Sequence, residues 1–190
     1  SMGESSTSEG YFYEAVNGAS HEKLPVVFVV QDNGYGISVP KRDQTANEFA
    51  SDNFAGFPNL KVIHCDGKDL FDSLRAMREA VAFAASGAGC VLVHAHCVRI
   101  HSHSNSDRHE LYRDEAELAA AKAADPLPRL RRQLLELNAF SEAELAAIEV
   151  HRLNRGLHVA AWLERSGGHQ HLQAIELANA VVCEDEDIGP

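Results

Sequence analysis

The chain has 190 residues, enough for one domain with a small additional unit, and 45% of them are hydrophobic, so it can bury a core. Its formal net charge of −11 argues against nucleic acids and anionic membranes as partners, because both reward Lys and Arg. No apolar run approaches the roughly 20 residues of a membrane span, and no secretory signal is visible. We therefore expect a cytoplasmic protein whose four scattered cysteines are buried free thiols.

The first half of the chain predicts a strand and helix alternation. Ser6 to Glu9 has the S-x-x-E form of a capping box, so we expect a helix from there to about His21. The continuous apolar run Val26 to Val30 is typical of a strand buried on both faces of a parallel sheet. Residues 31–47 are predicted to be a loop, and Leu60 to Cys65 a second strand.

A longer helix and a third strand follow. The helix is predicted over Asp69 to Ala85 and is broken by Gly87 to Gly89. Its larger apolar side chains fall on one face, the kind of stripe that faces a core: Leu70, Leu74, Met77 and Val81. The strand is predicted over Cys90 to Val98, and the chain after residue 113 is predicted to be helical in three pieces.

The alternation indicates an α/β fold with a parallel sheet flanked by helices and a helical C-terminal segment. We divide the chain into an α/β binding region over 1–125, a helical segment over 126–165, and a tail of unknown role over 166–190.

Two loops have the residue types of a site for a phosphate and a cation. The turn at Gly3 to Ser6 opens a helix and can present backbone N–H groups to a phosphate. Asp32 to Gly36 follows a strand, and its carbonyl and amide oxygens suit a hard cation. Glu4 and Asn33 lie 29 residues apart, close to the length of a strand–helix–strand unit, so both can reach one sheet edge as ligands of Mg²⁺. The alternative is an ordinary helix cap and an ordinary turn.

No strand pattern precedes Gly3-Glu4 in the sequence, although a parallel sheet delivers binding residues at the ends of strands. We therefore expect either that the chain is a fragment or that a partner supplies this strand. A third loop, 99–113, holds His101, His103 and His109, which could suggest zinc, but their spacing matches no standard structural zinc site.

Five segments, in order, resemble the α subunit of thiamine-diphosphate-dependent 2-oxo acid dehydrogenases, most closely the branched-chain type. They are GESSTSEGYFYEA from Gly3, VVFVVQDNGYGISVP from Val26, QTA from Gln44, RIHSHSNSDRHELYR from Arg99 and ADPLPRLRRQLL from Ala124. The similarity extends from Gly3 to about Ile148. It implies a thiamine-diphosphate-binding fold, present in part, with thiamine diphosphate and Mg²⁺ as cofactors.

The resemblance also implies roles for individual residues. Metal ligands would be Glu4, Asn33 and the backbone carbonyl of Tyr35; cofactor contacts would be Ser5, Ser6, Gln31 and His103. His103 would in addition be catalytic, assisting acyl transfer to lipoamide. The residues that order its loop would be Arg99, Ser104, Asp107, Tyr112 and Arg113, with Ser104 matching a serine that is phosphorylated in regulated enzymes. Two departures are Ser5 in place of a glycine, which could strain the turn, and Asp32 in place of an asparagine.

The implied function is oxidative decarboxylation of branched-chain 2-oxo acids, with transfer of the acyl unit to a lipoyl group. The implied partners are a β chain or β half and a lipoyl-bearing acyltransferase, in an oligomer without nucleic acid or membrane. Alternatives are a pyruvate-type component and a non-catalytic fragment that only binds partner chains. The acid that activates the cofactor belongs to the β chain in this family, and the family's upstream α segment is missing, so we expect the isolated chain to be inactive.

Overall fold

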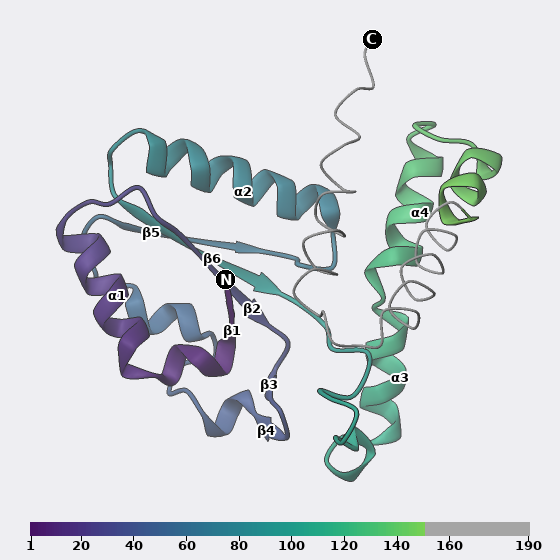
Figure 1. Ribbon diagram of the computed structural model, residues 1–190, viewed down its shortest axis with the longest axis horizontal. Helices are drawn as coiled ribbons and strands as arrows, with labels where there is room; N and C mark the ends of the chain where they lie inside the picture. Colours follow the sequence, from purple (N-terminus) through teal and green to yellow (C-terminus); the bar gives the residue numbers. More distant parts are fainter. Residues whose placement is uncertain (151–190) are drawn as a thin grey trace, which may run out of the picture. The chain divides into compact units, whose positions relative to one another are not determined.

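The computed structural model describes residues 1–150, which contain a four-stranded parallel sheet (Figure 1). Its strands are β1 (Met2–Gly3), β2 (Val27–Asp32), β5 (Leu60–Cys65) and β6 (Cys90–His96). Their order is β1-β2-β6-β5, and each neighbouring pair is parallel. Tyr35–Gly36 (β3) and Val39–Pro40 (β4) form a separate antiparallel pair. The predicted α/β class, a parallel sheet flanked by helices, is confirmed.

The α-helices in the described part of the chain are α1 (Gly10–His21), α2 (Leu70–Ala85), α3 (Glu115–Ala123) and α4 (Pro126–Glu136), and residues 142–150 are also helical. Short 3-10 helices are η1 (Glu4–Ser8), η2 (Lys41–Asp43), η3 (Ala50–Phe54) and η4 (His109–Leu111). No described helix is long and apolar enough to cross a membrane.

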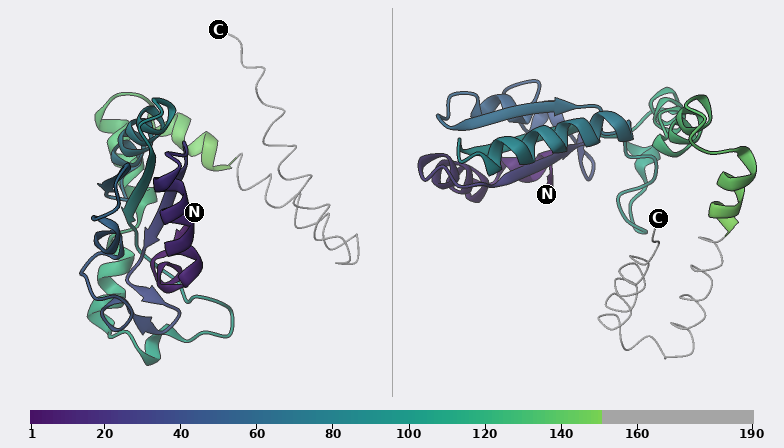
Figure 2. Two further views of the ribbon diagram at one scale, coloured as in Figure 1. Left: turned by 90° about the vertical axis from the view of Figure 1, so that its left-hand side faces the viewer. Right: turned by 90° about the horizontal axis from the view of Figure 1, so that it is seen from above.

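Two cores form because alternate strand residues point to opposite faces of the sheet. On one face α2 packs against a cluster that includes Ile63, Val91 and Val93. On the other, α1 packs with a cluster that includes Val30 and Leu92. The two helices lie on opposite sides of the sheet (Figure 1 and Figure 2). Both faces of β6 are therefore covered, and six of its seven residues are buried.

The buried face of α2 differs from the prediction. Ala76, Ala80 and Ala84 face the sheet and are almost fully buried. The larger side chains predicted for this face are instead exposed or half-buried: Leu70 at 45%, Leu74 at 42% and Val81 at 55% exposed, with Met77 intermediate. The branched side chains of β5 and β6 fill the space under the helix, so the small alanines allow the helix to approach closely.

Strand boundaries and burial also differ in part from the prediction. Leu60–Cys65 is a strand as predicted, but β2 continues through Gln31 and Asp32, which were assigned to a loop, and β6 ends at His96. The run Val26 to Val30 is not buried throughout: of its members only Val30 is buried. The cause is β1, which pairs with β2 only at Val30 and Gln31 and leaves the rest of that edge uncovered.

The N-terminal turn corrects two expectations. A strand does precede Glu4, because β1 pairs in parallel with β2. The capping box does not form, since α1 begins after Glu9, whose side chain makes no cap and whose N–H donates to the carbonyl of Ser6. The turn is held instead by the Thr7 hydroxyl, which donates to the carbonyl of Glu4 at 2.5 Å.

The chain divides into two compact units between Arg132 and Gln133, seven residues beyond the boundary drawn from the sequence at 125. The sheet and its helices belong to the first unit. Of the predicted helical segment, residues 151–165 lie outside the described residues, as do the tail and Cys183. The described thiols are free: Cys65 and Cys90 are buried, and Cys97 is half-buried.

Candidate functional site

A hollow of about 630 Å³ brings together the three loops identified in the sequence. The N-terminal turn, the segment after β2 and the loop after β6 all contribute, because parallel strands present their C-terminal ends at one edge of the sheet. The lining residues are Gly3, Glu4, Ser5, Ser6, Ser8, Glu9, Asn33, Tyr35, Gly36, Ile37, Val39, Gln44 and His103.

Glu4 is the buried acid of this hollow, with only 3% of its surface exposed. Its Oε2 accepts a hydrogen bond from the backbone N–H of Asn33 at 3.2 Å, whereas Oε1 is buried and has no partner. Burial raises the pKa of Glu4 above its ordinary value. A buried carboxylate oxygen without a partner is costly, and a bound cation would satisfy it.

The segment after β2 is folded by its own side chains. Asp32 Oδ1 accepts from the N–H of Gly34 at 2.9 Å, and Asn33 Oδ1 accepts from the N–H of Tyr35 at 3.2 Å. Gly34 has φ of 84°, a conformation that favours glycine. These bonds place Asn33 beside Glu4, with a further lone pair of the Asn33 amide oxygen available to a cation.

The backbone strain expected at Ser5 is not observed. Ser5 and Ser6 line the hollow, but Ser5 does not have positive φ, so the strain expected from replacing a glycine there is absent. The backbone of Gly36 instead approaches Ser5 closely, because a Cβ added to Gly36 would lie 2.7 Å from Cβ of Ser5. Gln31, assigned to the cofactor by resemblance, is exposed on β2 and is not in the lining.

A hydrogen-bond network holds the loop after β6. Arg99 donates to the carbonyl of Ile37 and to the Tyr112 hydroxyl, both at 2.8 Å. Asp107 Oδ2 accepts from the Tyr112 hydroxyl and from the backbone N–H of His103, both at 2.7 Å. Arg113, which is buried, donates to the carbonyl of Arg99 at 2.8 Å. The loop that carries His103 is thus tied to the segment after β2.

His103 and Ser104 lie at the open side of this loop. Both are exposed, His103 lines the hollow, and the Ser104 hydroxyl lies 3.2 Å from that of Ser106. His101, His103 and His109 do not form a metal-binding group: His109 is buried while the other two are exposed. Within residues 1–150 the metal-capable side chains that converge are different ones.

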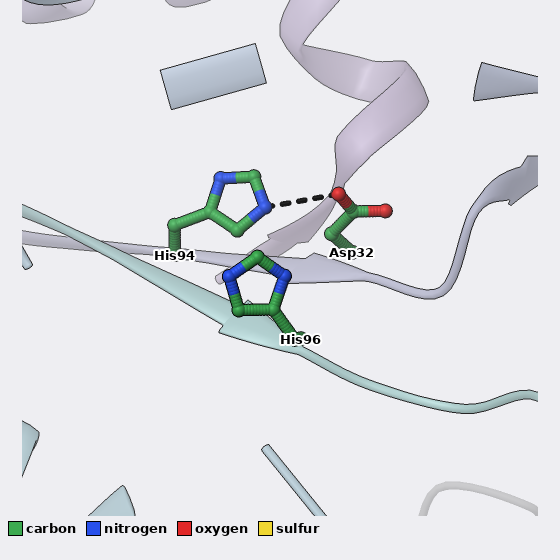
Figure 3. A group of neighbouring side chains, drawn as sticks. All are labelled: Asp32, His94 and His96. Atoms are coloured by element: carbon green, nitrogen blue, oxygen red, sulfur yellow. Dashed lines mark hydrogen bonds and ion pairs between the residues drawn. The ribbon is translucent and has the colours of Figure 1, made fainter. Parts of the chain in front are cut away.

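That second group consists of Asp32, His94 and His96 and was missed in the sequence (Figure 3). His94 Nε2 lies 2.9 Å from Asp32 Oδ2, and Lys41 Nζ donates to the same oxygen at 2.8 Å. Burial alone would raise the pKa of Asp32, but the hydrogen bonds from His94 and Lys41 outweigh it and hold the pKa at about 2. Burial and the neighbouring His94 lower the pKa of His64 and of His96.

A signal for this group does exist in the sequence. His94 and His96 alternate with apolar residues in a strand, so both point to one face. Their convergence with Asp32 depends on strand order and register, which no motif encodes.

Residues 1–155 match the dehydrogenase E1 component family, and the chain belongs to this family. It is 35% identical to the 2-oxoisovalerate dehydrogenase subunit alpha of Bacillus subtilis over 74% of this chain and 42% of that one. It is 37% identical to the pyruvate dehydrogenase E1 component subunit alpha of Mycoplasma pneumoniae over 77% of this chain and 41% of that one. The 3-methyl-2-oxobutanoate dehydrogenase subunit alpha of Mycobacterium tuberculosis is 34% identical over 74% of this chain and 38% of its own length.

The chain therefore spans about two fifths of the length of these relatives. Relatives named for a branched-chain substrate and for pyruvate match with nearly equal identity.

Proposed function

We propose that this chain is the part of a 2-oxo acid dehydrogenase that holds the magnesium ion and the diphosphate of thiamine diphosphate. The observation that carries the proposal is the hollow in which a buried acid with an unpartnered oxygen, an asparagine and a serine-rich turn meet. Carboxylate, amide and carbonyl oxygens are the donors that Mg²⁺ prefers, and small residues let the backbone approach phosphate oxygens.

The residues present fit this pair of ligands. Glu4, Asn33 and the Tyr35 carbonyl would hold the metal, and the backbone at Ser5 and Ser6 would hold the diphosphate. The chain is acidic overall, so the metal ion is needed to neutralise the diphosphate beside a carboxylate. When bound, thiamine diphosphate supplies the carbon nucleophile and the electron sink that decarboxylation of a 2-oxo acid requires.

His103 would act at the outer side of the same hollow. An imidazole can hold a phosphate and move a proton near neutral pH. This ring is exposed and lines the hollow, so a lipoyl arm arriving from solvent would be able to reach it. We propose that it assists transfer of the acyl unit to the lipoyl group of an acyltransferase. A phosphate on Ser104 would add negative charge beside the diphosphate and inhibit the reaction.

For the substrate we propose branched-chain 2-oxo acids, with pyruvate as the second candidate. Glu4 and the H-S-x-S-D form at His103 to Asp107 favour the branched-chain type by resemblance. A complex reconstituted with the β chain should turn over 2-oxoisovalerate with a higher kcat/KM than pyruvate. The reverse preference would assign the chain to the pyruvate type.

The binding proposal is tested with Glu4→Gln, which keeps the shape of the side chain and removes its charge. In the complex reconstituted with the β chain, calorimetry should show that the affinity for thiamine diphosphate in the presence of Mg²⁺ falls by at least ~10-fold, because the metal loses a charged ligand. Glu9→Gln is a matched control, since Glu9 lines the same hollow but is exposed. Equal affinity of the Glu4→Gln complex and the wild-type complex would refute the assignment.

A further inference from the structure

A cluster of polar side chains lies near the C-terminal ends of β2, β5 and β6, on the face of the sheet that α1 covers. Asp32 and His96 are direct partners across β2 and β6, and His64 and His94 are direct partners across β5 and β6. All four point to the face on which Val30 and Leu92 are core residues. Three adjacent strands therefore deliver a carboxylate and three imidazoles to one place.

The donor atoms converge closely enough to bind one ion. One ligand atom from each of Asp32, His94 and His96 lies within 4.8 Å of the others, and both labelled rings direct a nitrogen toward the aspartate (Figure 3). Asp32 is 4% exposed and His94 is fully buried. The strands fix these side chains, so little ordering is left to be done on binding.

His64 selects the nitrogen of His96 that is free to bind. Ser51 Oγ and Asp52 Oδ1 lie 3.3 and 3.9 Å from Nε2 of His64, which favours hydrogen on that nitrogen. His64 Nδ1 then accepts from the Nε2–H of His96 at 3.2 Å, and the lone pair of His96 is left on Nδ1. A hydrogen bond of this kind behind a ligating histidine is a regular feature of metal sites.

Two neighbouring side chains affect cation binding: Phe49 packs over the group, and Lys41 competes with a cation for Asp32. The Phe49 ring packs edge-on against the imidazoles of His64, His94 and His96, with centroids 5.0 to 5.6 Å apart, and covers part of the group. Lys41 Nζ already occupies Asp32 Oδ2, so a metal ion has to displace this ammonium group. The Lys41 side chain is 24% exposed and has a path into solvent.

We propose that Asp32, His94 and His96 form a binding site for a divalent transition metal ion of the zinc type. Two imidazoles and one carboxylate match zinc and its neighbours rather than Mg²⁺, which prefers oxygen ligands alone. Three protein ligands leave one position for water or a small ligand. The site does not rest on the proposed function, because its donor side chains are separate from Glu4, Asn33 and Tyr35.

The test is a titration of the purified, metal-free chain with Co²⁺, whose visible absorption distinguishes four-coordinate nitrogen and oxygen sites from the hydrated ion. The wild-type chain should bind one Co²⁺ with four-coordinate absorption, Zn²⁺ should displace it, and excess Mg²⁺ should not. His96→Gln should weaken binding by at least ~10-fold, as expected for loss of a ligand. The matched control is His101→Gln, an exposed histidine outside the group.

Lys41→Met should raise the affinity for Co²⁺, whereas His96→Gln should lower it. The Lys41→Met change removes the competing ammonium group while keeping most of the side-chain volume, so Co²⁺ should bind more tightly than to the wild-type chain. Circular dichroism checks that each variant is folded. The proposal is overturned if the wild-type chain gives no four-coordinate absorption, if His96→Gln binds like the wild-type chain, if His101→Gln loses the signal, or if Lys41→Met binds no more tightly.

Discussion

Arg99 shows how one side chain can join two loops of the candidate site. Its guanidinium group donates to the carbonyl of Ile37 and to the hydroxyl of Tyr112. Ile37 has φ of 57°, which is unfavourable for a β-branched residue and costs on the order of 1–3 kcal/mol. The bond from Arg99 stabilises this strained turn, and the strained turn in turn shapes the wall of the hollow beside Gly36.

Arg99→Lys should loosen both loops while leaving the fold intact, because an ammonium group cannot reproduce the two directed bonds of the fork. We expect limited proteolysis to cut within residues 100–111 several times faster than in the wild-type chain. Arg108→Lys, at an exposed arginine of the same loop, is the control. Equal cleavage of the Arg99→Lys and wild-type chains would show that the loop is held by other contacts.

His103→Ala should separate cofactor binding from acyl transfer in a complex reconstituted with the proposed β chain. Cofactor binding should remain measurable, whereas lipoyl-coupled turnover should fall by ~10²–10⁴-fold, the usual contribution of a proton-transfer group. Decarboxylation measured with an artificial electron acceptor should fall much less. Small, equal losses in the two assays would indicate a structural histidine, and His101→Ala provides the control.

At the scale of elements, α2 shows that size of side chain and not only hydrophobicity decides which helix face is buried. The alanines at positions 76, 80 and 84 recur every four residues and lie against the sheet, while the leucines face solvent. Hydrophobic periodicity predicted the existence and length of this helix. It could not decide whether the face of small alanines or the face of larger side chains packs against the sheet.

Ala80→Leu should therefore lower the free energy of unfolding by ~1–3 kcal/mol, because the added atoms overpack a site with no exposed surface. Val81→Thr, one residue away on the exposed side, should change it by less than ~0.5 kcal/mol. Chemical denaturation measures both. A larger effect at residue 81 than at residue 80 would restore the face predicted from the sequence.

A charged cluster links α4 to the start of α2. Arg129 donates to Asp66 Oδ2 at 2.7 Å and to Asp69 Oδ2 at 2.5 Å, and Lys68 Nζ lies 2.6 Å from Asp66 Oδ1. Burial alone would raise the pKa of Asp66, but the hydrogen bonds from Lys68 and Arg129 lower it from 3.8 to about 2.

The lowered pKa predicts loss of stability in acid. The contribution of Asp66 is complete above its unfolded-state pKa of 3.8 and is lost as the pH falls through about 2. The thermal midpoint of the wild-type chain should thus exceed that of Asp66→Asn at pH 5, and the difference should shrink toward pH 2. Asp43→Asn, at an exposed aspartate, should show a smaller difference at pH 5. A difference that stays constant with pH would contradict this interpretation.

At the scale of the whole molecule, the sequence predicted the helices and strands better than the contacts between them. The three longer strands and the convergence of three loops follow from apolar runs and from the rule that parallel strands share an edge. β1 has two residues, too short for any pattern to predict. The group around His94 depends on the register between β2 and β6, in which Asp32 pairs with His96, 64 residues further along the chain, so only the folded sheet reveals it.

The isolated chain should bind thiamine diphosphate and Mg²⁺ weakly and should not turn over 2-oxo acids. The hollow is proposed to hold only the metal ion and the diphosphate, and the resemblance implies that the acid that activates the cofactor belongs to a β chain. Calorimetry with and without added β chain, together with an activity assay, checks this. Micromolar affinity and turnover by the chain alone would show that one chain contains the complete site.

The interior strand β6 and the edge strand β1 differ in how easily they open. β6 is paired along its length on both sides, so its amides exchange with solvent only when the domain unfolds as a whole. β1 pairs through Met2 and Gly3 alone and can detach at a small fraction of that free energy. The buried carboxylate of Glu4 follows this weakest strand, whereas His94 lies on β6 and Asp32 lies on β2, which pairs with β6 along its length. Local fluctuations of β1 would therefore move the side of the hollow proposed to hold magnesium while the imidazole group stays intact.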